Sequence, residues 1–215
     1  MELRSLSAKL KPGALLMGAL FLTSSFSAFS VQAAEEMLRK PVAKGAYEMV
    51  WNPVEPGLFL ATSQSRSLDK GGIVYRLDPQ TLDVTQIIHN DIKPFGAAVN
   101  TKTGILYFGN TVNSAVTAID AKTGDVKGRL VLDDRKRTEA VRPLAPRELV
   151  VDEATNTVYI GGLGNPSVLW VVDGATMTLR TTITGLGKMN TGLAIDSEAK
   201  RIYTTNADGE FITID

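Results

Sequence analysis

The chain has 215 residues, of which 23 are Lys or Arg, 23 are Asp or Glu, and none is cysteine. The balanced charge argues against a protein that binds nucleic acid through bulk charge alone. The absence of cysteine excludes disulfide bonds and thiol chemistry, so the packing of a core must supply the stability.

The first 33 residues are typical of a secretory signal peptide. Three basic residues precede an uncharged apolar run over Gly13–Phe29, and small residues at positions −3 and −1 predict cleavage after Ala33. The run is shorter than the roughly 20 residues of a membrane-spanning helix. We therefore expect a protein exported to a bacterial periplasm, with no membrane insertion after signal cleavage.

From residue 34 onward, one pattern of strands and turns is repeated four times. In each unit an aromatic residue lies 13 positions after the start of the first apolar strand, and the third strand closes in aspartate. The aromatic residues are Phe59, Tyr107, Tyr159 and Tyr203, and the aspartates are Asp78, Asp120, Asp173 and Asp215. A strand repeat of this period is typical of a β-propeller. We therefore predict an all-β domain over 34–215, made of four-stranded antiparallel blades at about 46–88, 94–132, 146–183 and 190–215.

The expected strands can be placed in chain order by their apolar alternation and by the Gly, Asn and Asp turns between them. The first unit has a long second turn from Ser63 to Gly72. Strands of the second unit are expected at 95–99, 105–109, 115–119 and 126–132. Those of the third are expected at 147–151, 158–161, 168–172 and 177–183, and those of the fourth at 191–195, 201–205 and 210–214. An insertion at about Asp133–Ala145 explains the longer spacing between the second and third units.

The fourth unit supplies three strands, and the sequence leaves two interpretations of how the ring closes. A strand at Met37–Val42 completes this unit in one interpretation, which gives a closed ring of four blades. In the other, the four units are the front of a longer ring in a chain that is apparently truncated.

Two sets of residues carry a resemblance to a known family. Tyr203–Asn206 with Phe211–Asp215, and Leu106–Asn110 with Val116–Asp120, resemble the YVTN-type β-propeller repeat. Segments outside the repeat, such as Leu130–Thr138, are similar to a family of enterobacterial periplasmic propellers that carry it. The resemblance implies the N-terminal portion of a seven-bladed ring. It also implies a non-catalytic binding protein with single-stranded DNA as a possible partner.

Alignment of the four inner strands places several functional side chains in one register. Glu48, Gly96, Glu148 and Gly192 share one position, and Tyr47, Phe95, Arg147 and Thr191 precede it. Inner strands of a propeller begin at the mouth of its central channel. The carboxylates, the arginine and the aromatic rings are therefore predicted to face one opening.

Paired carboxylates at such a mouth have two explanations. They can bind a divalent cation or act in acid–base chemistry, as in a propeller lactonase or a quinoprotein-like dehydrogenase. More simply, they pair with Arg147 or accept backbone N–H groups. We expect the simpler explanation to hold, with no enzyme activity, no metal and no cofactor. The single histidine, His89, is expected to be exposed.

The insertion is the second candidate site. Between Lys127 and Arg147 there are seven basic and three acidic residues. Arg135, Lys136, Arg137, Arg142 and Arg147 form its basic centre. These side chains suit a track for phosphates, with Tyr47, Trp51, Phe95 or Trp170 available for base stacking. Trp51 and Trp170 lie within predicted strands, so packing between blades is their expected role. The alternative is a solvated loop neutralised by its own acidic residues. Envelope proteins or peptides are further possible partners.

Overall fold

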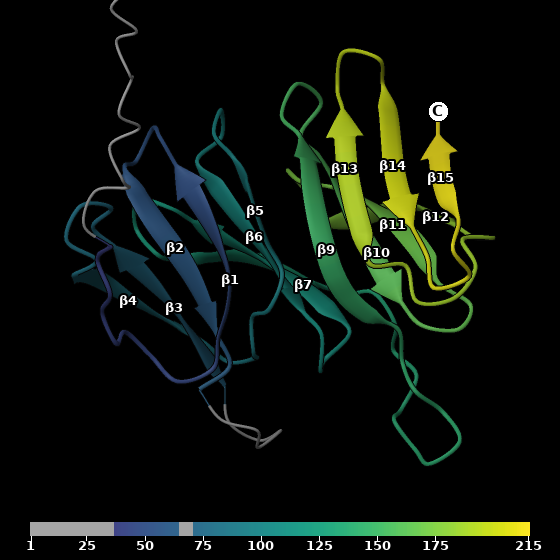
Figure 1. Ribbon diagram of the computed structural model, residues 1–215, viewed down its shortest axis with the longest axis horizontal. Helices are drawn as coiled ribbons and strands as arrows, with labels where there is room; N and C mark the ends of the chain where they lie inside the picture. Colours follow the sequence, from purple (N-terminus) through teal and green to yellow (C-terminus); the bar gives the residue numbers. More distant parts are fainter. Residues whose placement is uncertain (1–36, 65–70) are drawn as a thin grey trace, which may run out of the picture. The chain divides into compact units, whose positions relative to one another are not determined.

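The structure is a computed structural model that describes residues 37–64 and 71–215 (Figure 1). Within these residues it contains 15 strands and no helix, so the described part holds no helix that could cross a membrane. The predicted signal peptide, and most of the turn from Ser63 to Gly72, fall outside the described residues.

The strands form four antiparallel sheets, here called blades 1 to 4, and in each the strands pair in chain order. Blade 1 contains β1 (Ala46–Asn52), β2 (Gly57–Thr62), β3 (Gly72–Leu77) and β4 (Val84–Asn90). Blade 2 contains β5 (Ala97–Asn100), β6 (Ile105–Asn110), β7 (Ala115–Asp120) and β8 (Val126–Val131). Blade 3 contains β9 (Ala145–Asp152), β10 (Thr157–Leu163), β11 (Val168–Asp173) and β12 (Thr178–Ile183). Blade 4 contains β13 (Gly192–Asp196), β14 (Arg201–Thr205) and β15 (Phe211–Ile214). The all-β architecture predicted from the repeat is confirmed.

The repeated aspartates have a local structural role. The Asp78 carboxylate accepts the backbone N–H groups of Gln80 and Thr81 at 2.9 and 2.8 Å. Asp120 and Asp173 accept the corresponding pairs of N–H groups in their own turns. Because these hydrogen bonds favour the ionised form, the pKa values of Asp78 and Asp120 lie below the ordinary value. In blades 1 to 3 the aspartate therefore closes the third strand by ordering the turn that follows it.

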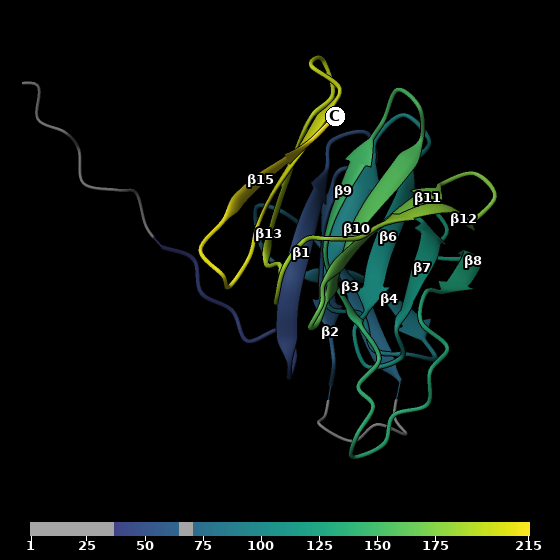
Figure 2. The ribbon, with the colours of Figure 1, turned by 90° about the vertical axis from the view of Figure 1, so that its right-hand side faces the viewer.

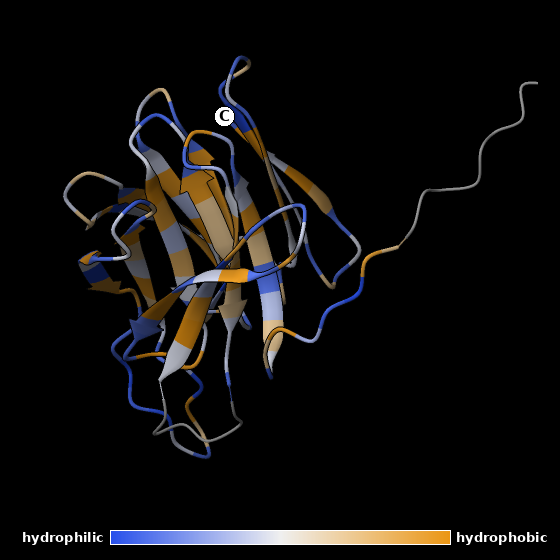
Figure 3. Cartoon of the chain, turned by 90° about the vertical axis from the view of Figure 1, so that its left-hand side faces the viewer, coloured by the Kyte–Doolittle hydropathy of each residue, from blue (hydrophilic) through white to orange (hydrophobic). Residues whose placement is uncertain are grey.

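The core lies between neighbouring blades, because the central strands are apolar on both faces (Figures 2 and 3). Blade 1 contributes Phe59 and Val74 to a cluster with Leu106 and Phe108 of blade 2. The next cluster, between blades 2 and 3, is built around Tyr107, Ile160 and Trp170. A third cluster joins blades 3 and 4 through Leu169 and Ile202. Each sheet thus buries one face against the next, as stacked propeller blades do.

Two expectations for the strands and their aromatic residues are wrong. Residues 37–42 form no strand, and blade 4 has three strands. Lys40 instead forms an ion pair with Asp83, next to the outer strand of blade 1, and Pro41 has no N–H to give to a sheet. Trp51, expected to pack between blades, is 45% exposed on β1.

Candidate functional site

The inner strands of the blades begin at one edge of the assembly, which is the lower edge in Figure 1. Neighbouring inner strands contact one another, and Gly96 allows the closest approach. A Cβ atom at Gly96 would lie 1.8 Å from the carbonyl oxygen of Arg147. The absence of a carboxylate at this register position in blade 2 therefore has a steric cause, because no side chain fits between β5 and β9.

Five residues from blades 1 to 3 form a cluster at this edge, called here the axial cluster: Tyr47, Glu48, Phe95, Arg147 and Glu148. The rings of Tyr47 and Phe95 meet edge to face, with centroids 5.0 Å apart. The guanidinium carbon of Arg147 lies 5.0 Å from the Tyr47 ring centroid. Arg147 Nε lies 3.9 Å from Glu148 Oε1. The register predicted from the repeat thus brings these side chains together.

Glu48 has the most perturbed carboxyl group of the axial cluster. Burial and the nearby Glu148 raise its pKa to about 7, against the opposing effects of the Ala97 N–H and of Arg147. A carboxyl group that titrates near neutral pH can take up or release a proton. Both simpler interactions expected for the glutamates are present, since Glu48 accepts a backbone N–H and Glu148 pairs with Arg147.

Blade 4 does not contribute to the axial cluster. In the described residues, no hydrogen bond, ion pair or ring contact joins Thr191 or Gly192 to the five residues; the Thr191 N–H is bonded to the Thr205 carbonyl. Nor do the described residues contain a group of three or more His, Cys, Asp or Glu placed to hold a metal ion. His89 lies exposed on β4.

The insertion between β8 and β9 is fastened at both ends by one residue of blade 2. The carbonyl of Ser114 accepts the N–H of Leu132 at 2.7 Å, and its hydroxyl donates to the carbonyl of Leu144 at 2.7 Å. The Asp133 carboxylate accepts the Leu144 N–H at 2.7 Å and the Arg135 guanidinium at 2.5 to 3.1 Å. Chiefly through Arg135, these bonds lower the pKa of Asp133 to about 2. The loop therefore has a defined conformation.

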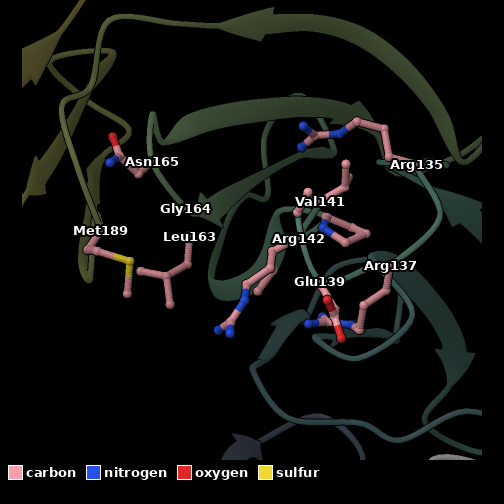
Figure 4. A pocket seen from close by; sticks show the side chains of 12 residues that line it. Arg135, Arg137, Glu139, Val141, Arg142, Leu163, Gly164, Asn165 and Met189 are labelled. Carbon is pink, nitrogen blue, oxygen red and sulfur yellow. The ribbon is translucent and has the colours of Figure 1, made fainter.

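The predicted basic centre of the insertion is divided by the structure. Arg135, Arg137 and Arg142 line a hollow of about 580 Å³ (Figure 4). Lys136 is exposed outside this lining. Arg147 belongs to the axial cluster. Arg135 is bonded to Asp133, so its charge is neutralised within the insertion.

The opposite wall of the hollow comes from blade 3 and from the segment that leads to blade 4. Leu163 is the last residue of β10, Gly164 and Asn165 follow it, and Met189 precedes β13. The Met189 N–H donates to the Gly164 carbonyl at 2.7 Å, which holds the two segments together. These residues were absent from the sequence prediction. The Gly164–Asn165–Pro166 turn was a usable clue, because it joins the second and third strands of its blade at the same end as the insertion.

Two aromatic residues expected as stacking platforms lie elsewhere. Trp170 is 3% exposed and packs in the core between blades 2 and 3, so a base cannot reach it. Trp51 lies near the end of β1, away from the edge at which that strand begins. Tyr47 is 45% exposed, and the axial cluster therefore offers an accessible aromatic ring.

Sheets stacked face to face, with their inner strands side by side, define a β-propeller protein. Solved structures show the same fold. The hydrazine synthase of Kuenenia stuttgartiensis matches with a TM-score of 0.65 at 17% identity, over 85% of this chain and 49% of that chain. A chain of a nidogen/laminin complex matches with a TM-score of 0.56 at 18% identity, over 77% of this chain and 58% of that chain. At these identities the likeness concerns the fold alone.

Sequence comparison identifies the relatives. All 215 residues align with the uncharacterized protein YncE of Escherichia coli (strain K12) at 70% identity and with that of Salmonella typhi at 68%. The chain is thus YncE-like along its whole length, and it spans 60% of the length of each of these relatives. Four blades in that share of the length agree with a ring of about seven. No protein-family model matches the sequence.

Proposed function

We propose that this chain is part of an exported, non-catalytic binding propeller whose ligand is single-stranded DNA. The observation that carries the proposal is the convergence of two features at one end of the blades. The axial cluster lies where the inner strands begin, and the insertion leads directly into β9 at that same end (Figure 1).

The chemistry of this end suits an unpaired nucleic acid strand. Lys136, Arg137 and Arg142 offer cations for phosphates, and Tyr47 with Phe95 offers aromatic surface at the same end of the blades. Such proteins combine a cationic path for the backbone with aromatic rings for the bases. Because the net charge is near zero, phosphate binding by this chain depends on a local group of cations such as this one. The resemblance to the enterobacterial periplasmic propellers supports the same ligand.

Removal of the exposed cations tests this function. We expect Lys136→Ala combined with Arg137→Ala to weaken binding of a fluorescent oligothymidine by roughly an order of magnitude at low salt. The loss of two phosphate contacts is expected to flatten the slope of log K against log salt by about 1.4. Fluorescence anisotropy over a series of salt concentrations measures both quantities.

Two further variants separate the contributions of position and loop structure. Lys102→Ala with Lys122→Ala removes two exposed cations from the turns at the opposite end of blade 2 and serves as the matched control. Arg135→Ala added to the first pair also disturbs the insertion, because Asp133 loses its partner. An unchanged salt slope in the Lys136/Arg137 variant would contradict the proposed path.

A further inference from the structure

The hollow beside the insertion has the size of a small-molecule site. Its volume of about 580 Å³ falls within the roughly 300–1,000 Å³ of typical ligand pockets. It shares no residue with the axial cluster. The hollow can therefore hold a ligand while another molecule contacts the axial cluster.

The lining of the hollow carries three arginines and one carboxylate, that of Glu139, and this balance favours an anion. Arg135 is neutralised by Asp133, but Arg137 and Arg142 form no ion pair and no side-chain hydrogen bond with any described residue. In Figure 4, Arg142 projects between the side formed by Leu163 and Met189 and the side formed by Arg137 and Glu139. A guanidinium group presents paired N–H donors that match the two oxygens of a carboxylate.

The apolar residues of the lining favour an anion that carries an aliphatic group. Val141, Ala145, Leu163 and Met189 supply apolar surface, and none of the lining residues is aromatic. A nucleobase would lack the ring on which bases stack in single-strand binding sites. A branched or straight hydrocarbon chain, by contrast, gains from burial against leucine and methionine. The Asn165 side chain, at the same wall, adds an amide for hydrogen bonding.

Both walls of the hollow are already ordered, which lowers the entropic cost of binding. On the insertion side, Thr138 and Val141 exchange two hydrogen bonds of 2.9 Å that close a tight turn. On the opposite side, the Ser167 hydroxyl accepts the N–H of Asn190 at 3.0 Å, next to the bond between Met189 and Gly164. The backbone segments that carry the arginines and the apolar wall are thus each held by hydrogen bonds.

We propose that this hollow binds an aliphatic carboxylate, with the carboxylate on Arg142 and Arg137 and the hydrocarbon chain against Leu163 and Met189. The C-terminus of a peptide that ends in an aliphatic residue and a free branched-chain acid share this chemistry. The proposal does not rest on DNA binding, but Arg137 and Arg142 belong both to this hollow and to the proposed phosphate path.

Calorimetric titration of the purified chain with three probes tests the proposal. The probes are N-acetyl-Ala-Leu with a free carboxylate, the same dipeptide as its C-terminal amide, and 4-methylpentanoate. We expect saturable binding of the free dipeptide acid in the range of about 0.1–1 mM, and at least about tenfold weaker binding of the amide. Tighter binding of the dipeptide than of 4-methylpentanoate identifies a peptide end, and equal binding identifies the free acid.

Variants of the two walls complete the experiment. Arg142→Gln is expected to weaken binding of the dipeptide acid at least about tenfold. Arg142→Lys is expected to weaken it less, because lysine keeps the charge without the paired donors. Met189 has a φ of +52°, so Met189→Asn keeps the backbone conformation while it removes the apolar contact. Lys122→Gln is the control. Equal affinity for acid and amide, or no saturable binding of either acid, overturns the proposal.

Titration with oligothymidine separates the two functions. Dipeptide binding without oligonucleotide binding leaves this inference intact and contradicts the proposed function. Oligonucleotide binding without binding of either acid supports the proposed function and overturns this inference.

Discussion

At the scale of single residues, the environment of Glu48 links the fold to pH. Its pKa is raised to about 7 from the ordinary value of 4.5, so the folded chain holds a proton that the unfolded chain has lost. Between these two values, stability falls as pH rises, because the folded state binds more protons than the unfolded state. Above pH 7, the ionised Glu48 carboxylate therefore destabilises the fold around the axial cluster.

The substitution Glu48→Gln tests this linkage. Glutamine keeps the shape and cannot ionise, so we expect it to stabilise the chain at pH 8 and to have little effect at pH 4.5. Glu48 is half-buried, and solvent screening limits the gain to the order of 1 kcal/mol, or about 2–4 °C in Tm. Thermal unfolding at several pH values measures the difference. Glu198→Gln, in an exposed turn, controls for the loss of a carboxylate; a gain that does not grow with pH would contradict the assignment.

At the scale of the elements, the contact between β5 and β9 depends on one missing side chain. Gly96→Ala places a Cβ atom against the backbone of Arg147, and backbone cannot move aside as a flexible side chain does. We expect a loss of more than about 2 kcal/mol in the free energy of unfolding, measured by urea titration.

A second buried glycine provides the matched control. A Cβ atom at Gly161 meets nothing nearer than 3.6 Å, so Gly161→Ala is expected to change stability by less than about 0.5 kcal/mol. Similar losses in the two variants would show that the tight approach at Gly96 is not what holds the inner strands.

The sequence was sufficient to predict the elements wherever local pattern decides the structure. Alternating apolar residues and turn aspartates such as Asp120 placed the strands of the complete blades to within a few residues, and the repeat register placed Glu48 near Glu148. The conformation of the insertion was not predictable, because Ser114 and Leu144 meet through bonds between residues 30 apart. The strand expected at Met37–Val42 was wrong, since apolar pattern alone does not reveal the ion pair of Lys40 with Asp83.

At the scale of the whole molecule, the outer faces of the first and last blades remain uncovered. Met49 of blade 1 is 58% exposed and Phe211 of blade 4 is 70% exposed, whereas the facing sheets of the interior blades bury such residues. The chain spans 60% of the length of its YncE relatives, and in a longer ring these two faces are where further blades pack.

The predicted export concerns the whole chain, and the expected cleavage of the signal peptide is testable. Expressed in Escherichia coli with a C-terminal tag, the chain is expected in the periplasmic fraction, with Ala34 as its first residue after cleavage. Osmotic-shock fractionation and N-terminal sequencing measure location and cleavage. A tagged chain that keeps Met1 and stays with the cytoplasmic fraction would contradict export.

The hydrogen bonds by which Ser114 holds both ends of the insertion have a consequence for how such a propeller can diversify. Both ends of the insertion are tied to one buried residue of blade 2, so a change of length or composition at the tip near Thr138 is not transmitted to the sheets. The tip can therefore acquire new recognition properties while the scaffold beneath it keeps its geometry, much as hypervariable loops do on an invariant framework.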